Sequence, residues 1–252
     1  MGKVYLVGAG PGACDLLTVR AARLLARADV VFHDALVEPD VLHLAPDAVK
    51  VAVGKRCGAH STSQRFINKR LVDAAARYDT VVRLKGGDPM LFGRAQEEID
   101  ALVDAGVDVE VVPGVTAALA AAADLNVSLT RRGVARSVTL VTPRAGEGES
   151  PHAWTRAAAA ADTAVIYMGA GEATSIVAAL LAAGVPTDHP VALVENAGRD
   201  RETHCAGALC DLPRLAAARG TGPAVILLGE VARALVAQES APAAIVLRRA
   251  TG

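Results

Sequence analysis

The stretch Gly86-Gly87-Asp88-Pro89 has the residue types of a ligand-binding turn, and it follows an apolar run, Thr80–Leu84. Two adjacent glycines let backbone amides approach a ligand without Cβ atoms in the way. Pro89 restricts Asp88 to extended conformations, which fixes the direction of the Asp88 carboxylate. A tight turn between strand and helix would explain the same residues, so both interpretations stay open at this point.

Two other carboxylates are candidates for proton transfer. Asp34 follows the apolar run Val30–Phe32, where a carboxylate can act as a general base or cap the next helix. Glu97 lies three residues after Arg94 at the start of an expected helix, so the two side chains share a face. The pattern is equally consistent with a surface ion pair and with an ionised base beside a substrate.

Cations cluster in similar loops. Lys55 and Arg56 lie in Gly54–His60, where flanking glycines favour close approach of an anion to the basic side chains. Arg132 belongs to a second basic spot after Ser128-Leu129-Thr130. We expect such loops to bind a ligand with several carboxylates, although a basic loop can also be only a solvated one.

The first loop, Gly8–Ala13, fits the G-x-G-x-x-A pattern of dinucleotide-binding proteins, and Asp34 follows at a suitable distance for a ribose contact. This pattern leads to the rival hypothesis of an NAD- or FAD-binding oxidoreductase. It explains none of the later loops, however, and a different small-ligand loop or a simple packing turn fits it as well. A non-enzymatic sensor of a small ligand is a third class.

Short apolar runs alternate with amphipathic segments along the chain, which predicts an α/β fold of two αβα domains with mostly parallel sheets. We expect domains at 1–114 and 115–252, with the boundary at Gly114. The expected strands are Val4–Val7, Val30–Phe32, Lys50–Val53, Thr80–Leu84, Val109–Val112, Val138–Val141, Ala164–Tyr167, Val191–Val194 and Ala224–Leu228. The expected helices are Asp15–Ala28, Gln64–Tyr78, Ala95–Ala105, Ala117–Ala123, Glu172–Ala183 and Leu212–Ala218. Because ligands bind beyond the carboxyl ends of parallel strands, two facing sheets would gather the special loops in one cleft.

Composition excludes several classes of protein. The 252 residues are 52% hydrophobic and only 3% aromatic, and the formal net charge of −1 gives no electrostatic case for nucleic-acid binding. No apolar run is long enough for a membrane span, and the N-terminus has no signal-peptide pattern, so we expect a cytoplasmic protein. The four cysteines and six histidines show no metal-ligand spacing, so no metal is expected.

Eight segments together resemble the tetrapyrrole methylase family, and they follow the family's order over almost the whole chain. They are VGAGPGACDLLT (7–18), HDALV (33–37), GKRCGAHSTSQRFIN (54–68), VVRLKGGDPMLFGRAQEE (81–98), VVPGVTAA (111–118), SLTRRG (128–133), YMG (167–169) and VALVENAGR (191–199). The pairing of GKR-x-G-x-H with RLKGGDP-x-x-FGR distinguishes this sequence from family members that modify rRNA or diphthamide.

The resemblance implies a homodimer that binds S-adenosylmethionine in the cleft between two domains and releases S-adenosylhomocysteine. It implies methylation of two pyrrole carbons of uroporphyrinogen III, giving precorrin-2 by way of precorrin-1 for siroheme, cobalamin or haem d1. A later corrin precursor is the alternative substrate.

The resemblance also implies roles for single residues. Asp34 and Lys55 would handle protons, with Glu97 as the alternative base, and the rim arginines would bind substrate carboxylates. The implied cofactor contacts are Pro11, Gly86, Gly87, Asp88, Leu91, Thr116, Ala117, Met168 and Ala197. Because the implied substrate has eight carboxylates, our candidates for contacts to it are Arg56, Arg94 and Arg132.

Overall fold

The computed structural model describes residues 1–54, 64–146, 148, 150 and 153–239. It divides the chain into two compact units, Met1–Ala117 and Ala118–Gly252, so the division falls close to the boundary expected at Gly114. In the described part of the chain, no helix is long and apolar enough to cross a membrane.

Strands and helices alternate in the first unit. They are β1 (Lys3–Gly8), η1 (Cys14–Leu16), α1 (Val19–Leu25), β2 (Val30–His33), α2 (Pro39–His43), β3 (Val49–Ala52), α3 (Gln64–Ala75), β4 (Thr80–Lys85), α4 (Ala95–Asp104) and β5 (Val109–Val112). The strands form a sheet of order β3-β2-β4-β1-β5, and each neighbouring pair is parallel. The expectation of a parallel sheet is therefore correct for this unit.

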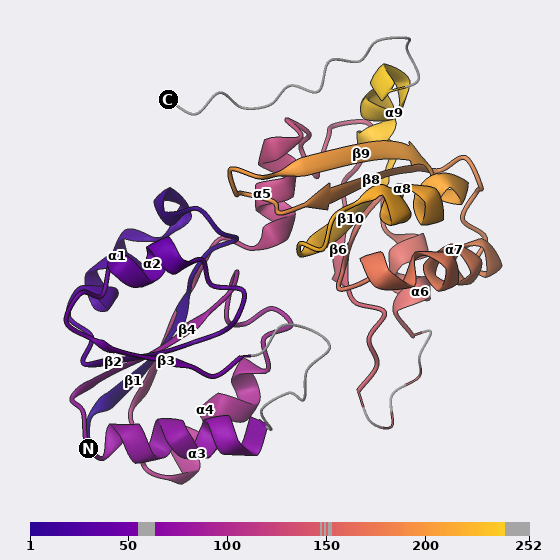
Figure 1. The fold of residues 1–252 in the computed structure, drawn as a ribbon. Helices are drawn as coiled ribbons and strands as arrows, with labels where there is room; N and C mark the ends of the chain where they lie inside the picture. Colours follow the sequence, from indigo (N-terminus) through magenta and orange to yellow (C-terminus); the bar gives the residue numbers. More distant parts are fainter. Residues whose placement is uncertain (55–63, 147, 149, 151–152, 240–252) are drawn as a thin grey trace. The chain divides into compact units, whose positions relative to one another are not determined.

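Two apolar layers hold this sheet. Val7, Val82 and Leu84 pack with α1 and α2, whereas Val4 and Val81 pack with α3 and α4. Successive side chains of a strand point to opposite faces, so each strand supplies both layers. Figure 1 shows the resulting arrangement, with α1 and α2 on one side of the sheet and α3 and α4 on the other.

The first helix is shorter than expected. The segment predicted as Asp15–Ala28 contains a 3-10 turn, Cys14–Leu16, and then α1, Val19–Leu25. Thr18 separates them, because its backbone is extended and its Oγ1 accepts a hydrogen bond from Ala21 N at 3.1 Å. This side chain caps α1 and defines its start.

The second unit has the same alternation, with one additional strand that was not predicted from the sequence. Its elements are α5 (Ala117–Asp124), β6 (Val138–Val141), α6 (Ala153–Ala160), β7 (Thr163–Tyr167), η2 (Ala170–Glu172), α7 (Ala173–Ala182), β8 (Pro190–Glu195), β9 (Thr203–Ala208), η3 (Leu209–Asp211), α8 (Leu212–Ala218), β10 (Ala224–Gly229), η4 (Glu230–Ala232) and α9 (Arg233–Glu239). The unpredicted strand is β9.

The second sheet has the order β6-β7-β10-β8-β9, and the expectation of a mostly parallel sheet is wrong here. Among the described strands of this second sheet, only β6 and β7 pair in parallel, because β10 inserts between β7 and β8 in the opposite direction and β9 returns antiparallel to β8. Strands β6, β7 and β8 still point the same way, so the loops that follow them lie at one edge.

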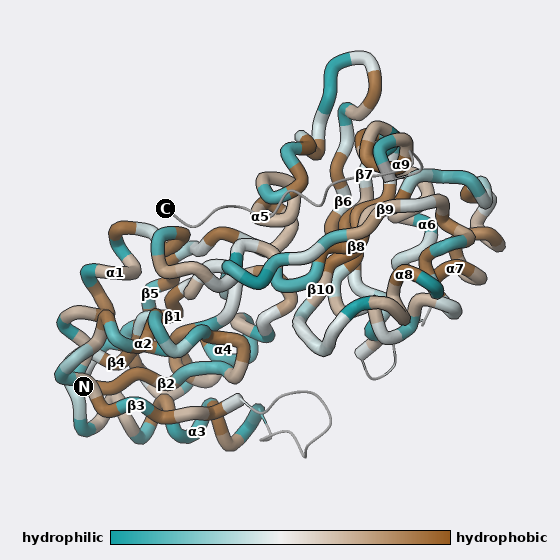
Figure 2. Tube along the Cα trace, turned by 45° about the horizontal axis from the view of Figure 1, so that its top comes forward, coloured by the Kyte–Doolittle hydropathy of each residue, from teal (hydrophilic) through white to brown (hydrophobic). Residues whose placement is uncertain are grey.

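The core of this unit lies between the sheet and α6, α7 and α8. Every residue of β8 is buried, and Figure 2 shows a hydrophobic colour along this strand. Ile176 and Leu180 of α7 and Leu212 of α8 are almost inaccessible to solvent, which fixes the helices on this face. The sheet therefore gives the following loops a rigid base.

Candidate functional site

The carboxyl edge of the first sheet gathers the loops that follow β1, β2, β4 and β5. Because these strands are adjacent and parallel, the glycine loop after β1, Asp34, the Gly86–Pro89 turn and Gly114 all lie at this edge. We call this set of loops the first edge.

Close backbone packing joins three of these loops. Gly10 and Gly87 exchange backbone hydrogen bonds, from Gly87 N to Gly10 O at 2.7 Å and from Gly10 N to Gly87 O at 3.2 Å. A Cβ on Gly8 would come within 2.6 Å of Gly114 Cα, a distance that real Cβ atoms essentially never show. Glycine at position 8 is therefore required by packing within the unit.

Gly87 differs, because its surroundings are open. Its φ is +69°, a conformation that favours glycine, yet a Cβ there would meet only Thr116 Cα, at 3.9 Å. A Cβ on Gly86 would meet only Leu36 Cβ, at 3.3 Å. Gly86 is thus tightly packed against Leu36, whereas the open side of Gly87 has room for a ligand against bare backbone, as the expected cofactor contact requires.

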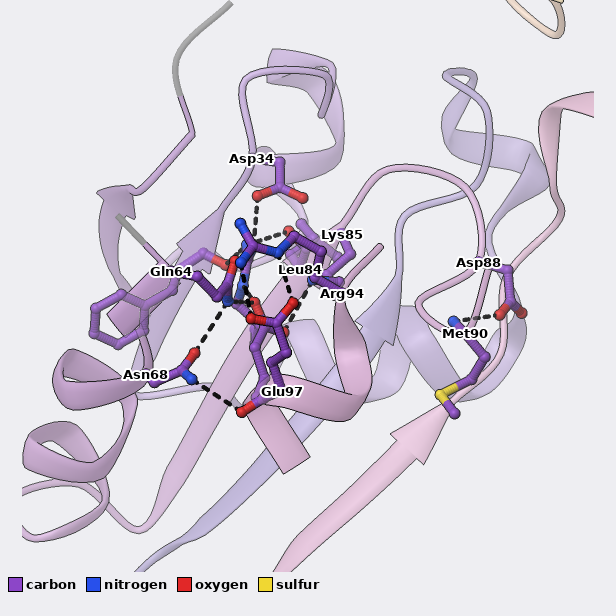
Figure 3. Close-up of polar contacts among 12 residues, drawn as sticks. Asp34, Gln64, Asn68, Leu84, Lys85, Asp88, Met90, Arg94 and Glu97 are labelled. Atoms are coloured by element: carbon purple, nitrogen blue, oxygen red, sulfur yellow. Dashed lines mark hydrogen bonds and ion pairs between the residues drawn. The ribbon is translucent and has the colours of Figure 1, made fainter. Parts of the chain in front are cut away.

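The Asp88 carboxylate ties this turn to its neighbour. Oδ1 accepts a hydrogen bond from Met90 N at 2.8 Å (Figure 3), and Oδ2 accepts one from Gly114 N at 2.9 Å. Both oxygens thus fix loop geometry, a role that was not predicted from the sequence. A contact between Asp88 and the cofactor stays a prediction.

The glycine loop after β1 does not have the geometry of a dinucleotide site. Such a site needs a helix that begins at the glycines and directs its N-terminus at phosphate. Here α1 begins only at Val19, and the Gly10 backbone is paired with Gly87. The rival oxidoreductase hypothesis therefore loses its structural basis.

Asp34 lies at the first edge, directly after β2, and its side chain is 29% exposed. Its Oδ1 accepts a hydrogen bond from Arg83 Nη2 at 2.6 Å (Figure 3). The alternative that Asp34 caps the next helix is wrong, because α2 has Glu38 at its N-cap position.

Arg83 and Lys85 lie on the same face of β4 as Val81, the face that α3 and α4 cover. Glu98 on α4 is completely buried and accepts from both, at 3.0 Å from Arg83 Nε and 2.9 Å from Lys85 Nζ. Gln64 of α3 donates to the same carboxylate at 3.1 Å. These residues form a buried charged cluster behind Asp34.

The protonation of this cluster follows from burial and pairing. Burial, together with repulsion from Arg83, lowers the pKa of Lys85 despite its contact with Glu98. Burial also opposes the charge of Arg83, but attraction from Asp34 and Glu98 outweighs it and raises the Arg83 pKa. Arg83 is therefore a permanent cation in contact with Asp34.

Arg83, Lys85 and Glu98 belong to one of the motifs that carry the family resemblance, but no role was predicted for them. A signal was available, because two charged residues at alternate positions of a buried strand need a counter-ion. Ala95, Glu98 and Leu102 are the buried residues of α4, and their spacing marks the inward face of this helix. Glu98 was thus recognisable as the counter-ion.

Arg94 and Glu97 form a surface ion pair. The Arg94 Nε and Nη2 atoms donate to the two carboxylate oxygens of Glu97 at 2.7 and 2.8 Å, and the side chains are 58% and 51% exposed. The Arg94 hydrogen bonds lower the pKa of Glu97, and the same contact raises the pKa of Arg94. The ion-pair interpretation from the sequence is therefore confirmed.

The other expected residues of the first unit lie nearby. Pro11 is buried in the glycine loop, Leu91 is half-buried after the Gly86–Pro89 turn, and Thr116 and Ala117 follow Gly114. Lys55 and Arg56 lie outside the described residues.

In the second unit, Met168 and Ala197 follow β7 and β8, two strands that point the same way. Met168 is 40% exposed with a φ of +56°, so its side chain is not part of the core. Ala197 is buried. Arg132 is exposed in the segment before β6.

We call the loops that follow β7 and β8 the second edge. Hydrogen bonds from backbone N–H groups hold the loop after β8 in place. Glu195 is only 4% exposed, and its carboxylate accepts hydrogen bonds from the backbone N–H groups of Gly220 and Gly222 at 2.8 and 2.5 Å. Gly198 N donates to Asp124 Oδ2 at 2.6 Å. No role was predicted for Glu195 from the sequence.

Among the described residues, no three His, Cys, Asp or Glu side chains lie close enough to hold a metal ion.

Comparisons with known proteins agree on one family. Residues 3–213 match the family model of Tetrapyrrole (Corrin/Porphyrin) Methylases. A uroporphyrinogen-III C-methyltransferase from Pseudomonas aeruginosa is 46% identical over 94% of this chain and 97% of its own. Siroheme synthase 1 from Klebsiella pneumoniae is 45% identical over 91% of this chain but only 49% of its own, so the chain spans about half of that relative.

A solved structure is also similar. The uroporphyrin-III C-methyl transferase from Thermus thermophilus, complexed with S-adenyl homocysteine, matches with a TM-score of 0.81 at 42% identity. The match covers 92% of this chain and 100% of that one.

Proposed function

Because the chain belongs to the tetrapyrrole methylase family, we propose that it is an S-adenosylmethionine-dependent methyltransferase acting on uroporphyrinogen III. It methylates two pyrrole carbons and gives precorrin-2 by way of precorrin-1, a precursor of siroheme, cobalamin and haem d1. The observation that carries this proposal is the similarity to the Pseudomonas aeruginosa enzyme over nearly the full length of both chains.

The chemistry assigns clear tasks to the protein. S-adenosylmethionine, when bound, supplies a methyl group on a sulfonium sulfur, which an electron-rich pyrrole carbon can attack. The new carbon–carbon bond forms as the sulfur–carbon bond breaks, and the product ring retains a surplus proton. The chain must align the two reactants and then accept this proton.

Asp34 is the better of the two candidate bases. Arg83 donates to its Oδ1, and we assign Oδ2 as the oxygen that faces the substrate. Glu97 has both oxygens bonded to Arg94, and this contact lowers its pKa and so weakens it as a base. We therefore assign proton removal to Asp34, with Lys55 as its expected partner.

The cofactor contacts divide between the two units. The open backbone at Gly87 supports its role and that of its neighbour Gly86, because bare backbone at Gly87 leaves space for a ligand. The other proposed contacts are Pro11, Asp88, Leu91, Thr116, Ala117, Met168 and Ala197. In the second unit, the exposed side chain of Met168 supports its place among them.

Arg56, Arg94 and Arg132 are the proposed partners of substrate carboxylates, because guanidinium groups bind carboxylates with paired hydrogen bonds. Arg94 already binds Glu97, so it contributes to the substrate side as half of an ion pair. A homodimer and a cytoplasmic location complete the proposal, and both derive from the resemblance and the sequence.

Two measurements test this function. Isothermal titration should show binding of S-adenosylhomocysteine and none of NAD. Anaerobic incubation with S-adenosylmethionine and uroporphyrinogen III should give a product that gains two methyl groups by mass spectrometry. Binding of NAD alone would support the oxidoreductase, and methylation of only a later corrin precursor would support that alternative. Binding without turnover on any tetrapyrrole would indicate a sensor.

A further inference from the structure

The guanidinium of Arg83 donates hydrogen bonds to several separate groups. Nε donates to Glu98, Nη2 donates to Asp34, and Nη1 donates to the backbone oxygens of Leu84 and Phe32 at 3.3 and 3.5 Å. The residue is only 2% exposed, so the neighbouring groups leave the guanidinium little freedom to rotate. Asp34 thus meets a donor in a fixed position.

Arg83 bonds to both carboxylates of the cluster. It pairs with Asp34 and with Glu98, and Lys85 pairs with Glu98. His33 also lies beside Asp34, with its Nδ1 3.3 Å from the Asp34 backbone oxygen. Arg83 is therefore the side chain that links Asp34 to the buried part of the cluster.

We propose that Arg83 is a positioning residue, which holds Asp34 Oδ1 so that Oδ2 faces the substrate. This inference rests on the proposed function, because it takes Asp34 as the base. Glu98 contributes by fixing Nε of Arg83, and Gln64 links Glu98 to the start of α3.

Arg83→Met tests the proposal, because Met has similar length but neither charge nor donors. Lys85 and Glu98 remain as a balanced pair in this variant, so the fold has no new unpaired buried charge. We expect kcat to fall by about 10- to 100-fold, since small misplacement of a catalytic group has effects of this size. The Kd for S-adenosylhomocysteine and the KM for uroporphyrinogen III should change less than about twofold.

The split between kcat and KM separates positioning from simple structural support. General structural damage would change KM and the Kd for S-adenosylhomocysteine together with kcat, whereas misplacement of Asp34 should lower kcat alone. Arg83→Lys keeps the charge but loses the guanidinium fork, so its kcat should still fall. If Arg83→Met does not fold, the kcat of Arg83→Lys alone decides the matter.

Arg233→Met is the matched control, since it removes an exposed arginine from an ion pair with Glu230 on the surface of the second unit. It should keep wild-type kcat and KM. Wild-type kcat in a folded Arg83 variant, or a loss of cofactor affinity equal to the loss of kcat, would overturn this inference and leave the proposed function standing. Wild-type protein without turnover would overturn the proposed function, and the inference with it.

Discussion

In the part of the chain that the structure describes, each unit has one buried glutamate, and different kinds of donor bind the two carboxylates. In the first unit, Glu98 is bound by the side chains of Arg83, Lys85 and Gln64. In the second, Glu195 is bound by backbone N–H groups of Gly220 and Gly222. The first arrangement links a buried charge to Asp34, whereas the second only fixes the shape of a loop.

The two arrangements predict different effects of mutation. A carboxylate held by charged side chains can respond to a proton change nearby, and a carboxylate held by backbone amides is a fixed structural element. We therefore expect variants of the first edge to change ligand binding or turnover. Variants of the second edge at Glu195 should change stability first.

The largest expected effect comes from Gly87→Val. A Cβ on the open side of the turn takes ligand space, and a β-branched residue tolerates the φ of +69° poorly. We expect S-adenosylhomocysteine to bind at least about 100-fold more weakly, as measured by isothermal titration.

Gly106→Val is the control for Gly87→Val, because Gly106 has the same φ of +69° and no atom lies within 4 Å of the position that a Cβ would take there. It carries the same backbone strain away from the first edge. Equal losses of affinity in the two variants would show that strain, rather than ligand space, explains the effect.

Glu195→Ala should destabilise the second unit without a new charge. It removes the carboxylate that accepts the hydrogen bonds of Gly220 N and Gly222 N, two partly exposed donors, at a cost of about 1.5–3 kcal/mol in the free energy of unfolding. Urea unfolding followed by circular dichroism measures this cost. Glu230→Ala, which breaks an exposed pair with Arg233, should cost less than about 1 kcal/mol. Similar costs for both would contradict the structural role of Glu195.

Arg132→Ala should raise the KM for uroporphyrinogen III by about fivefold, because it removes one exposed partner of a substrate carboxylate. The Kd for S-adenosylhomocysteine should stay unchanged in isothermal titration. A parallel loss of cofactor affinity would show that Arg132 had been assigned to the wrong ligand.

The smallest effect concerns the Arg94–Glu97 pair and its pH dependence. Arg94 lowers the Glu97 pKa below its ordinary value of 4.5, so the pair stabilises the fold above that pH and loses this contribution as pH falls further. Solvent screens these exposed groups, so the difference between wild type and Glu97→Gln should be only about 0.5 kcal/mol at about pH 6. Urea unfolding repeated at about pH 3 should show this difference shrinking, and a growing one would contradict the pairing.

Much of the fold was predictable, because buried strands such as β8 and β10 have nearly continuous apolar sequences. Strand β9, Thr203–Ala208, was not, since its residues include Gly207 and two alanines and have weak strand preference. The backbone hydrogen bonds of its pairing with β8 stabilise this strand despite its weak local preference. The antiparallel direction of β10 was also not predictable, because a buried apolar strand has the same kind of sequence whether it pairs in parallel or antiparallel.

The site was predictable in part. Gly87 and Asp34 were found from their positions after strands, and the structure brings them to one edge. The partners of these residues were missed, because Asp88 and Gly114 or Arg83 and Asp34 are far apart in sequence. Contacts of this kind depend on strand order, which a single sequence does not reveal.

The turnover of Asp34→Asn, measured beside that of Glu97→Gln, tests the central assignment most directly. Asn keeps the size of Asp34 and an acceptor for Arg83 but cannot take the proton. We predict that kcat falls by about 100-fold or more while the Kd for S-adenosylhomocysteine stays unchanged, and that Glu97→Gln keeps most of its turnover. Full turnover in Asp34→Asn together with its loss in Glu97→Gln would contradict the account and make Glu97 the base.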